Sequence, residues 1–398
     1  MRSKLLGGGA LVLALAISLP ATAQIAVSGN DNKRRLENAQ AAFVPNAPAD
    51  TATIIDLSGR APRVLGEVAL SHSVVGPPMS VAVTPDERYA IVTSAERADP
   101  ADPTKAVPDN RVQVIDLRAT PPRVTQTVEA GAGPSGVSVN RAGNLVLVAN
   151  RNAGTVSVFR LANGSLTPLS TVTIGSATSS PAHVQFTPDG RRALVTRDDA
   201  AGSFVSVLNV EGETVTKTNR DITVGIRPYG MGITPDGRWA AVANIGRGSG
   251  DADTITLINL QREPFLATET VSVGATPEGI QVSPDNRHVA VTIHNGSARL
   301  QSDPLRGRAQ LVMLRIDNGR LREVARAPVG DWAQGIAFSR DGKTILVQNM
   351  ADRNIAVFRF DDGRLRDTGQ RIPVNGGPAA IRTADVPPAP PPPARPRG

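Results

Sequence analysis

The chain has 398 residues, a formal net charge of +7, 40% hydrophobic residues and no cysteine. Without cysteine, the fold has no disulfide, no covalently attached c-type haem, no iron–sulfur cluster and no thiolate zinc site. Aromatic residues make up only 3% of the chain, so stacking platforms for single-stranded nucleic acid are scarce. We therefore expect no nucleic-acid partner.

The first 23 residues have the pattern of a secretory signal peptide. A basic start is followed by an apolar run over 5–19 and by the small-residue site Ala21-Thr22-Ala23. Cleavage near Ala23 would make Gln24 the first mature residue and would predict a periplasmic protein. The alternative, a retained membrane anchor, calls for a longer apolar run. No later segment of the sequence is apolar enough to span a membrane.

One sequence line recurs through the chain: Pro-x-x-apolar-x-apolar-x-Pro-Asp-Gly, followed by a short apolar run. Its opening column holds Pro78, Pro134, Pro181, Pro228, Pro277, Ala333 and Pro378. Six intervals over 300 residues give a mean repeat of 50, which is room for four short strands and their turns. The repeat therefore predicts an all-β fold, a seven-bladed β-propeller.

The two ends of the repeat region complement each other. After Pro378 the chain has only one more first strand. Near the N-terminus, 41–46, 51–57 and 63–70 are predicted to be a second, third and fourth strand. Three N-terminal strands and one C-terminal strand would then close the seventh blade, which removes the free sheet edges. The alternative, an open solenoid, does not explain these complementary ends.

These observations predict four regions. They are a signal peptide (1–23), an N-terminal extension (24–40), the propeller (41–385) and a proline-rich tail (386–398). Because a run of prolines cannot form a sheet strand, we expect the tail to be a disordered, polyproline-type extension.

Particular stretches of the repeat have a family character. Strands end in Val-Ala-Asn at Asn150 and Asn244, and TVSVFRLANGSL (155–166) matches NIAVFRFDDGRL (354–365). In these features the chain resembles the lactonase-type seven-bladed propellers, which include 6-phosphogluconolactonase-like and Tyr-Val-Thr-Asn-repeat proteins. Two smaller motifs of that group are matched by Pro181-Ala182-His183 and Trp332-Ala333. The resemblance implies the propeller fold and lactone hydrolysis. The further histidines that it implies along the inner strands are replaced here by Gly, Ala or Gln.

Enlarged loops predict which face of the ring carries a site. The two longest repeats have their extra residues between the second and third strands, at 94–110 and 293–308, and a smaller insertion lies at 244–253. In a propeller these loops share one face with the connections between blades, and that face surrounds one mouth of the central channel. We therefore predict a binding surface there.

Side chains that face the channel or its rim are the candidate site. The catalytic candidates are His183 as a base, Arg227 to hold an oxyanion or an acidic substrate, and Glu278 to orient the base or a metal. The ligand-binding candidates are Arg197, Tyr229, Asn244, Gln281, Trp332 and Arg382. His294, in a polar loop, is expected to be exposed. Asparagines that follow the second strand, Asn46 and Asn244 among them, have the alternative role of bonding their own turn.

Two functions from different classes fit this inventory. The first is an exported, monomeric scaffold that binds a small molecule or a partner protein on the loop-rich face. The alternative is a lactone hydrolase of the lactonase-like group. We expect no cofactor, although the sequence leaves open a divalent metal ion in the channel.

Overall fold

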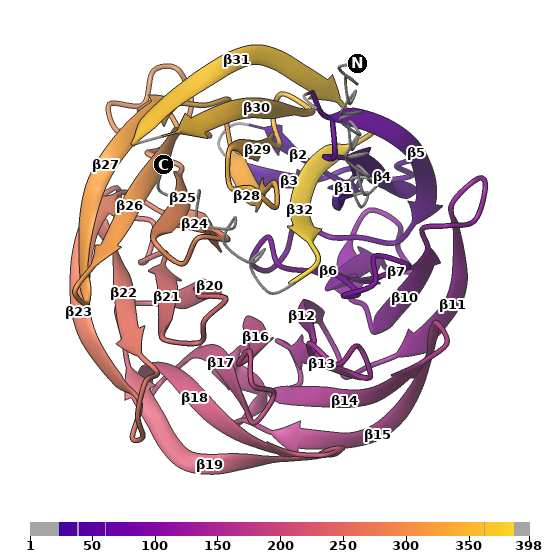
Figure 1. The fold of residues 1–398 in the computed structure, drawn as a ribbon. Helices are drawn as coiled ribbons and strands as arrows, with labels where there is room; N and C mark the ends of the chain where they lie inside the picture. The colour runs from indigo at the N-terminus through magenta and orange to yellow at the C-terminus, as the bar shows by residue number, and fades with distance from the viewer. Residues whose placement is uncertain (1–23, 38–39, 60, 362, 386–398) are drawn as a thin grey trace, which may run out of the picture.

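The computed structural model describes residues 24–37, 40–59, 61–361 and 363–385. Over these residues, seven four-stranded antiparallel sheets stand around a central channel, as Figure 1 shows. The predicted all-β, seven-bladed propeller is confirmed. The predicted signal peptide (1–23) and proline-rich tail (386–398) lie outside the described residues.

Each blade runs from an inner strand at the channel to an outer strand at the rim. Blade 1 contains β32 (Gly377–Thr383), β1 (Ile25–Asp31), β4 (Asp50–Asp56) and β5 (Arg63–Leu70). Blade 2 contains β6 (Val81–Val83), β7 (Tyr89–Thr93), β10 (Arg111–Asp116) and β11 (Arg123–Glu129). Blade 3 contains β12 (Pro134–Val139), β13 (Leu145–Asn150), β14 (Thr155–Ala162) and β15 (Ser165–Thr173).

The remaining four blades repeat this order. Blade 4 contains β16 (His183–Phe186), β17 (Arg192–Asp199), β18 (Gly202–Glu211) and β19 (Thr214–Thr223), preceded by the short 3-10 helix η1 (Ala177–Ser179). Blade 5 contains β20 (Pro228–Ile233), β21 (Trp239–Asn244), β22 (Asp253–Asn259) and β23 (Leu266–Gly274). Blade 6 contains β24 (Pro277–Val282), β25 (His288–Ile293), β26 (Gln310–Asp317) and β27 (Arg320–Pro328). Blade 7 contains β28 (Ala333–Phe338), β29 (Thr344–Asn349), β30 (Asn354–Asp361) and β31 (Arg364–Pro373).

The Pro-Asp-Gly line builds the hairpin between the first and second strands of a blade. In blade 4 the Thr187 hydroxyl donates to the Asp189 carboxylate at 2.6 Å, and Gly190 takes a φ of +71°. This backbone conformation costs glycine little, which is why the turn ends on that residue. These hairpins lie on what we call the lower face. The connections between blades, and those between second and third strands, lie on the opposite top face.

Blade 1 is closed by the two ends of the described chain. Strand β1 pairs with β32 on one side and with β4 on the other, and Figure 1 shows β1 in indigo beside β32 in yellow. Three N-terminal strands and one C-terminal strand therefore make this blade, as the sequence predicts.

The prediction of its second strand was nevertheless wrong. The second strand is β1, inside the predicted N-terminal extension, whereas residues near 41–46 form β3 (Gln40–Phe43), which pairs with β2 (Arg34–Glu37). Strand β1 is buried along its whole length although its second half is polar. Asn30, not Asn46, takes the asparagine position at the strand's end and donates to the Thr51 and Thr53 hydroxyls at 2.9 Å each.

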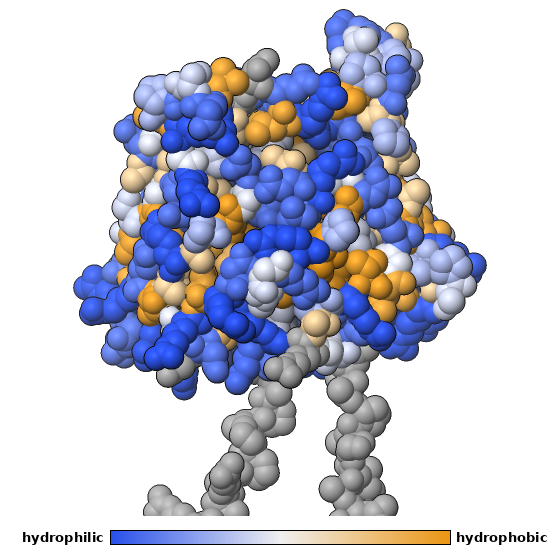
Figure 2. All heavy atoms as spheres, turned by 90° about the horizontal axis from the view of Figure 1, so that it is seen from above, coloured by the Kyte–Doolittle hydropathy of each residue, from blue (hydrophilic) through white to orange (hydrophobic). Residues whose placement is uncertain are grey.

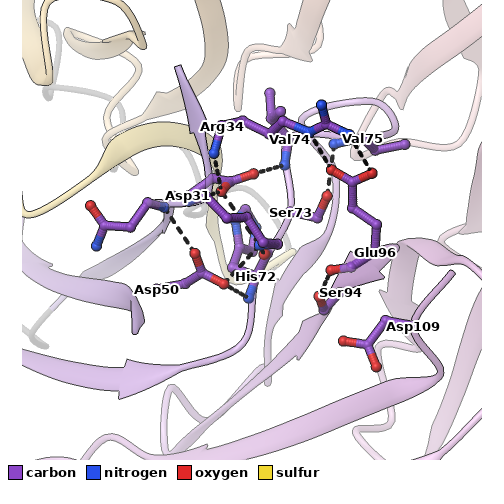
Figure 3. A network of polar contacts seen from close by, with 12 residues as sticks. Asp31, Arg34, Asp50, His72, Ser73, Val74, Val75, Ser94, Glu96 and Asp109 are labelled. Carbon is purple, nitrogen blue, oxygen red and sulfur yellow. Dashed lines mark hydrogen bonds and ion pairs between the residues drawn. The ribbon is translucent and has the colours of Figure 1, made fainter. Parts of the chain in front are cut away.

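A buried ionic cluster fixes the turn that follows β1. The Lys33 ammonium donates to Asp50 at 2.8 Å and to the His72 carbonyl, and it pairs with Asp31 at 3.4 Å. In Figure 3 the Asp31 carboxylate accepts the Val74 N–H, at 2.8 Å, and Asp50 lies beside His72. Burial raises the pKa of Asp31 to about 6, against the opposing charge of Lys33. The cluster links blade 1 to the segment that leads into blade 2.

Apolar side chains fill the spaces between neighbouring blades. One cluster joins Leu145 and Leu147 of blade 3 to Val184 and Val195 of blade 4. On the side wall seen in Figure 2, hydrophilic residues predominate and apolar residues form separate patches. Within the described part of the chain, no helix has the length and apolar character needed to cross a membrane.

Replacing Lys33 by methionine should destabilise the fold strongly. The change leaves two carboxylates, Asp31 and Asp50, buried without their cation, and breaking a buried ion pair costs about 3–5 kcal/mol. Arg35→Met is the control, because its pair with Glu37 is largely exposed and should contribute little. Chemical denaturation of both variants measures the difference. Equal stability of the two variants would contradict the role given to the cluster.

Candidate functional site

Four enlarged loops rise on the top face. Three of them, near 94–110, 244–253 and 293–308, are those predicted from the sequence, and the fourth connects β1 to β4 and contains the β2–β3 hairpin. The first of these loops carries its own hairpin, β8 (Glu96–Ala98) with β9 (Ala106–Pro108). Arg34 of the fourth loop and Glu96 bond through two nitrogen–oxygen pairs, at 2.6 and 2.8 Å, as Figure 3 shows. This contact joins two of the four loops on the top face.

A carboxylate and an imidazole meet at this mouth. Glu278 Oε2 lies 3.1 Å from His294 Nε2, and the same nitrogen lies 2.8 Å from the Ala333 carbonyl oxygen. Both side chains are about nine-tenths buried. Burial raises the pKa of Glu278, while His294, Gln334, Arg227 and Arg151 oppose the shift.

This geometry assigns the proton on the imidazole of His294. Nε2 faces two acceptors, the Glu278 carboxylate and the Ala333 carbonyl, so the neutral ring carries its hydrogen there. Nδ1 is then the basic nitrogen, and it makes no hydrogen bond to any described residue. A base oriented by a carboxylate at its other nitrogen is the arrangement used in general-base catalysis of acyl transfer.

A cavity of about 380 Å³ opens on the same face; neither Glu278 nor His294 lines it, but two of its arginines, Arg151 and Arg227, act electrostatically on Glu278. Three of its lining side chains, Arg151, Arg227 and Arg247, are cationic, and Tyr229 lies among them. The Arg151 guanidinium stands over the Tyr229 ring, 5.8 Å from its centre. Its Nη1 atom is buried and makes no hydrogen bond to the residues that the structure describes. An unpartnered buried guanidinium nitrogen suits an anionic ligand atom.

Carboxylates neutralise only part of the positive charge of the arginines at the cavity. Arg247 is paired with Asp198 at 2.6 Å, and Asp199 also lines the cavity. Arg227 is exposed, and its backbone φ of +56° points to a tight connection into β20. Because Arg151 and Arg227 both lower the pKa of Glu278, the cationic wall and the Glu278–His294 pair are electrostatically coupled.

Three of the residues predicted from the sequence therefore come together. Arg227, Tyr229 and Glu278 lie at the top mouth. They are close enough that the charge of Arg227 lowers the pKa of both Tyr229 and Glu278, against the effect of burial. Burial raises the pKa of the Tyr229 hydroxyl, so this group stays neutral and can only donate or accept a hydrogen bond.

His183 lies elsewhere, inside the ring wall. It is 1% exposed, its backbone N–H donates to the Thr196 hydroxyl, and it packs against Gly136 of blade 3. Burial, together with the positive charge of Arg382, holds the pKa of its imidazole well below the ordinary value. Of the two imidazoles, only that of His294 is oriented by a carboxylate, so the geometry favours His294 as the base. The expectation that His294 is exposed was wrong, because Glu278 and the Ala333 carbonyl hold it inside the mouth.

Arg197 and Asn244 are committed to their own blades. Arg197 donates to Ser206, pairs with Asp199 and Asp221, and lies over the Phe204 ring at 4.6 Å. The Asn244 amide donates to Thr254 and Thr256, which is the structural role that the sequence left open.

The other three predicted ligand residues lie at different levels of the channel. Trp332 is half-buried on the top face and packs against Val74 and Met350. Gln281 and Arg382 bond to each other at 2.5 Å, towards the lower end of the inner strands. Their ligand-binding roles stay predictions.

The sequence reading missed Arg151 and His294, which share one position. Each directly follows the last residue of a second strand, after Asn150 and Ile293 respectively. The sequence predicts a role for the asparagine column but none for the position that follows it. Among the described residues, no group of three or more His, Asp or Glu side chains is arranged to hold a metal ion.

Comparison with known proteins identifies the family of the chain. The family model "Lactonase, 7-bladed beta-propeller" matches residues 109–229 and 249–381, over half of the chain. The chain belongs to the lactonase family of seven-bladed propellers. A search of the curated proteins found no match.

Solved structures of similar fold include proteins named for lactone hydrolysis. A protein from Bacteroides uniformis, provisionally assigned as a 6-phosphogluconolactonase, is 19% identical with a TM-score of 0.69, covering 91% of this chain and 100% of its own. A similarly assigned protein from Bacteroides fragilis is 17% identical with a TM-score of 0.70, covering 92% and 99%. The periplasmic gluconolactonase of Pseudomonas aeruginosa is 20% identical with a TM-score of 0.65, covering 92% and 100%. At these identities the likeness concerns the fold.

The imidazole of His183 should stay neutral where an ordinary histidine becomes protonated. Because burial lowers its pKa well below 6.5, its ring ¹⁵N shifts should not change between about pH 8 and about pH 5. NMR of protein labelled at histidine, with His183→Gln used to assign the signal, measures this. A titration midpoint near the ordinary value would show that His183 reaches solvent.

Proposed function

We propose that this chain hydrolyses a lactone at the top-face cavity. The observation that carries the proposal is the Glu278–His294 pair, beside a cationic wall with an unpartnered Arg151 nitrogen. The sequence alone favoured a binding scaffold over hydrolysis. An oriented base next to oxyanion donors favours the hydrolase, because a binding surface has no need of that arrangement.

The residues divide the chemistry among them. His294 Nδ1 takes a proton from water while the water oxygen attacks the ring carbonyl carbon, and Nε2–H holds the resulting imidazolium against Glu278. Arg151 and Arg227 stabilise the negative charge that develops on the carbonyl oxygen. The ring C–O bond then breaks, and the leaving oxygen receives the proton from the imidazolium. The product is an open-chain hydroxy acid.

The substrate class is supported by the wall and by the relatives. The hydroxyl of Tyr229 and the arginines Arg151, Arg227 and Arg247 suit a polar, oxygen-rich ring. The similar structures from Bacteroides and Pseudomonas are named for gluconolactones, with and without a phosphate. We therefore propose a sugar-type lactone. The signal-peptide pattern supports action in the periplasm, where the Pseudomonas protein is named to act.

Removing the base should abolish most of the turnover. With glucono-δ-lactone in a pH-indicator assay, His294→Gln should lower kcat/KM by about 100-fold or more, the usual contribution of a general base. His288→Gln is the matched control, because His288 pairs with Asp285 on the lower face and should leave the rate unchanged. No turnover above the spontaneous rate across a panel of lactones would overturn the proposal. Saturable lactone binding without turnover would restore the binding scaffold.

The activity should have an acid limb set by Glu278. Hydrolysis needs the ionised carboxylate, and burial raises the pKa of this group above its ordinary value of 4.5. Protonation as the pH falls therefore removes activity at a higher pH than an exposed glutamate would. In Glu278→Gln the rate should be lower and this limb should disappear, as a kcat/KM profile over pH would show. An unchanged limb in the variant would exclude Glu278 as its origin.

A further inference from the structure

The opposite end of the channel contains a second, differently built cavity. It has a volume of about 70 Å³ and lies among the hairpins of the lower face. Its lining includes Gln24 at the start of blade 1's second strand and Asp385 just after β32. None of the side chains of the Glu278–His294 pair lines it, so it is separate from the proposed lactone site.

The lining of this lower cavity is part polar and part apolar. Its apolar part is a ring formed by one side chain from each of five consecutive inner strands: Val139, Phe186, Ile233, Val282 and Phe338. Each is at the same position of the repeat, five residues after the opening column. The apolar ring can bury the body of a small organic molecule but offers it no polar partner.

Polar atoms without partners lie at the inner end of the cavity. Gln185 is 6% exposed and lines the cavity, and its Oε1 accepts no hydrogen bond from the described residues. The carbonyl oxygen of Gln281 is taken by Arg382 Nη1 at 2.5 Å, which leaves the amide nitrogen of Gln281 free to donate to a ligand. A buried amide oxygen with no partner costs free energy until a ligand or water meets it.

An arginine reaches across the entrance. Arg141 lies where most blades have the proline of Pro-Asp-Gly, and its Nη2 donates to the Pro235 carbonyl of blade 5 at 2.6 Å, past the intervening blade 4. Among the described residues it has no carboxylate within 4 Å. Burial lowers its pKa, with Asp385 and Asp236 opposing from farther away. Its charge is therefore only partly compensated.

The other cations at this end are more fully paired. Arg340, the second residue in the proline position, pairs with Glu87 at 3.1 Å. Arg382 has Asp385 at 3.4 Å. Arg141 is thus the guanidinium best placed to accept an anionic group at the entrance.

We propose that the lower mouth is a second binding site, which takes a small organic monocarboxylate with a compact apolar body. The carboxylate pairs with Arg141, the body fills the ring of apolar side chains, and a hydroxyl on the body reaches Gln185 Oε1. At about 70 Å³ the cavity is smaller than one that encloses benzene, so the carboxylate end of a one-ring ligand lies outside it, at the entrance beside Arg141. This site is independent of lactone hydrolysis, because it lies at the other end of the channel.

The test uses 4-hydroxybenzoate as the probe, with the full chain and calorimetric titration backed by ligand-observed NMR. The neutral analogue 4-hydroxybenzamide keeps the ring and the hydroxyl but loses the charge. We expect saturable binding of the carboxylate and binding about tenfold or more weaker for the amide, as a charge-assisted hydrogen bond provides. Equal binding of the two probes, or no saturable binding of the carboxylate, would overturn the proposal.

Variants locate the site. Arg141→Gln should weaken 4-hydroxybenzoate binding by about tenfold or more, and Arg141→Lys, which keeps the charge, should recover much of it. Arg191→Gln, on the same face but exposed and outside the cavity, is the matched control and should bind as the unmodified chain does. Loss of binding in Arg151→Gln, or no change in Arg141→Gln, would move the ligand to the top cavity or to the general surface and refute a lower-mouth site.

Discussion

The pairing of β1 with β32 is the constraint on which the rest of the molecule depends. It joins Ala26 to Thr383 and Asp31 to Gly377, residues at the two ends of the described chain, in one antiparallel ladder. Without it, β32 and β1 would each present an unpaired edge. Closing so long a loop costs conformational entropy that only many simultaneous contacts offset. The Ser28, Asn30 and Lys33 contacts supply part of that compensation at the same junction.

Closure also makes the two channel mouths different. All seven inner strands run in the same direction along the channel, so residues early in each repeat meet at the top and residues later in each repeat meet at the bottom. Glu278 and Tyr229 follow the opening column by one residue, and Phe186 and Val282 follow it by five. A single sequence register therefore gives the Glu278–His294 pair at one mouth and a ring of apolar side chains at the other.

The propeller was predictable because its signal is local and repeated. The period, the hairpin turns and the alternating apolar residues recur so often that one weakly matching repeat does not change the predicted fold. The closing strand was misplaced because β1 has no such signal. Its polar half is buried only where Gln348 and Lys33 reach it, and no local pattern shows those contacts. For the site, the positions on either side of the opening proline predicted Arg227, Tyr229 and Glu278, but they could not show that His183 packs into the wall.

The sequence by itself determined the number of blades, the order of strands within them, the face that carries the enlarged loops and three of the residues at the top mouth. These features follow from a short-range periodicity that recurs in every repeat. The tertiary structure alone decided which histidine meets a carboxylate, which guanidinium is left unpaired and which strand closes the ring. Those outcomes depend on partners in other blades, such as the Ala333 carbonyl that accepts from His294, and on the burial that only the closed ring produces.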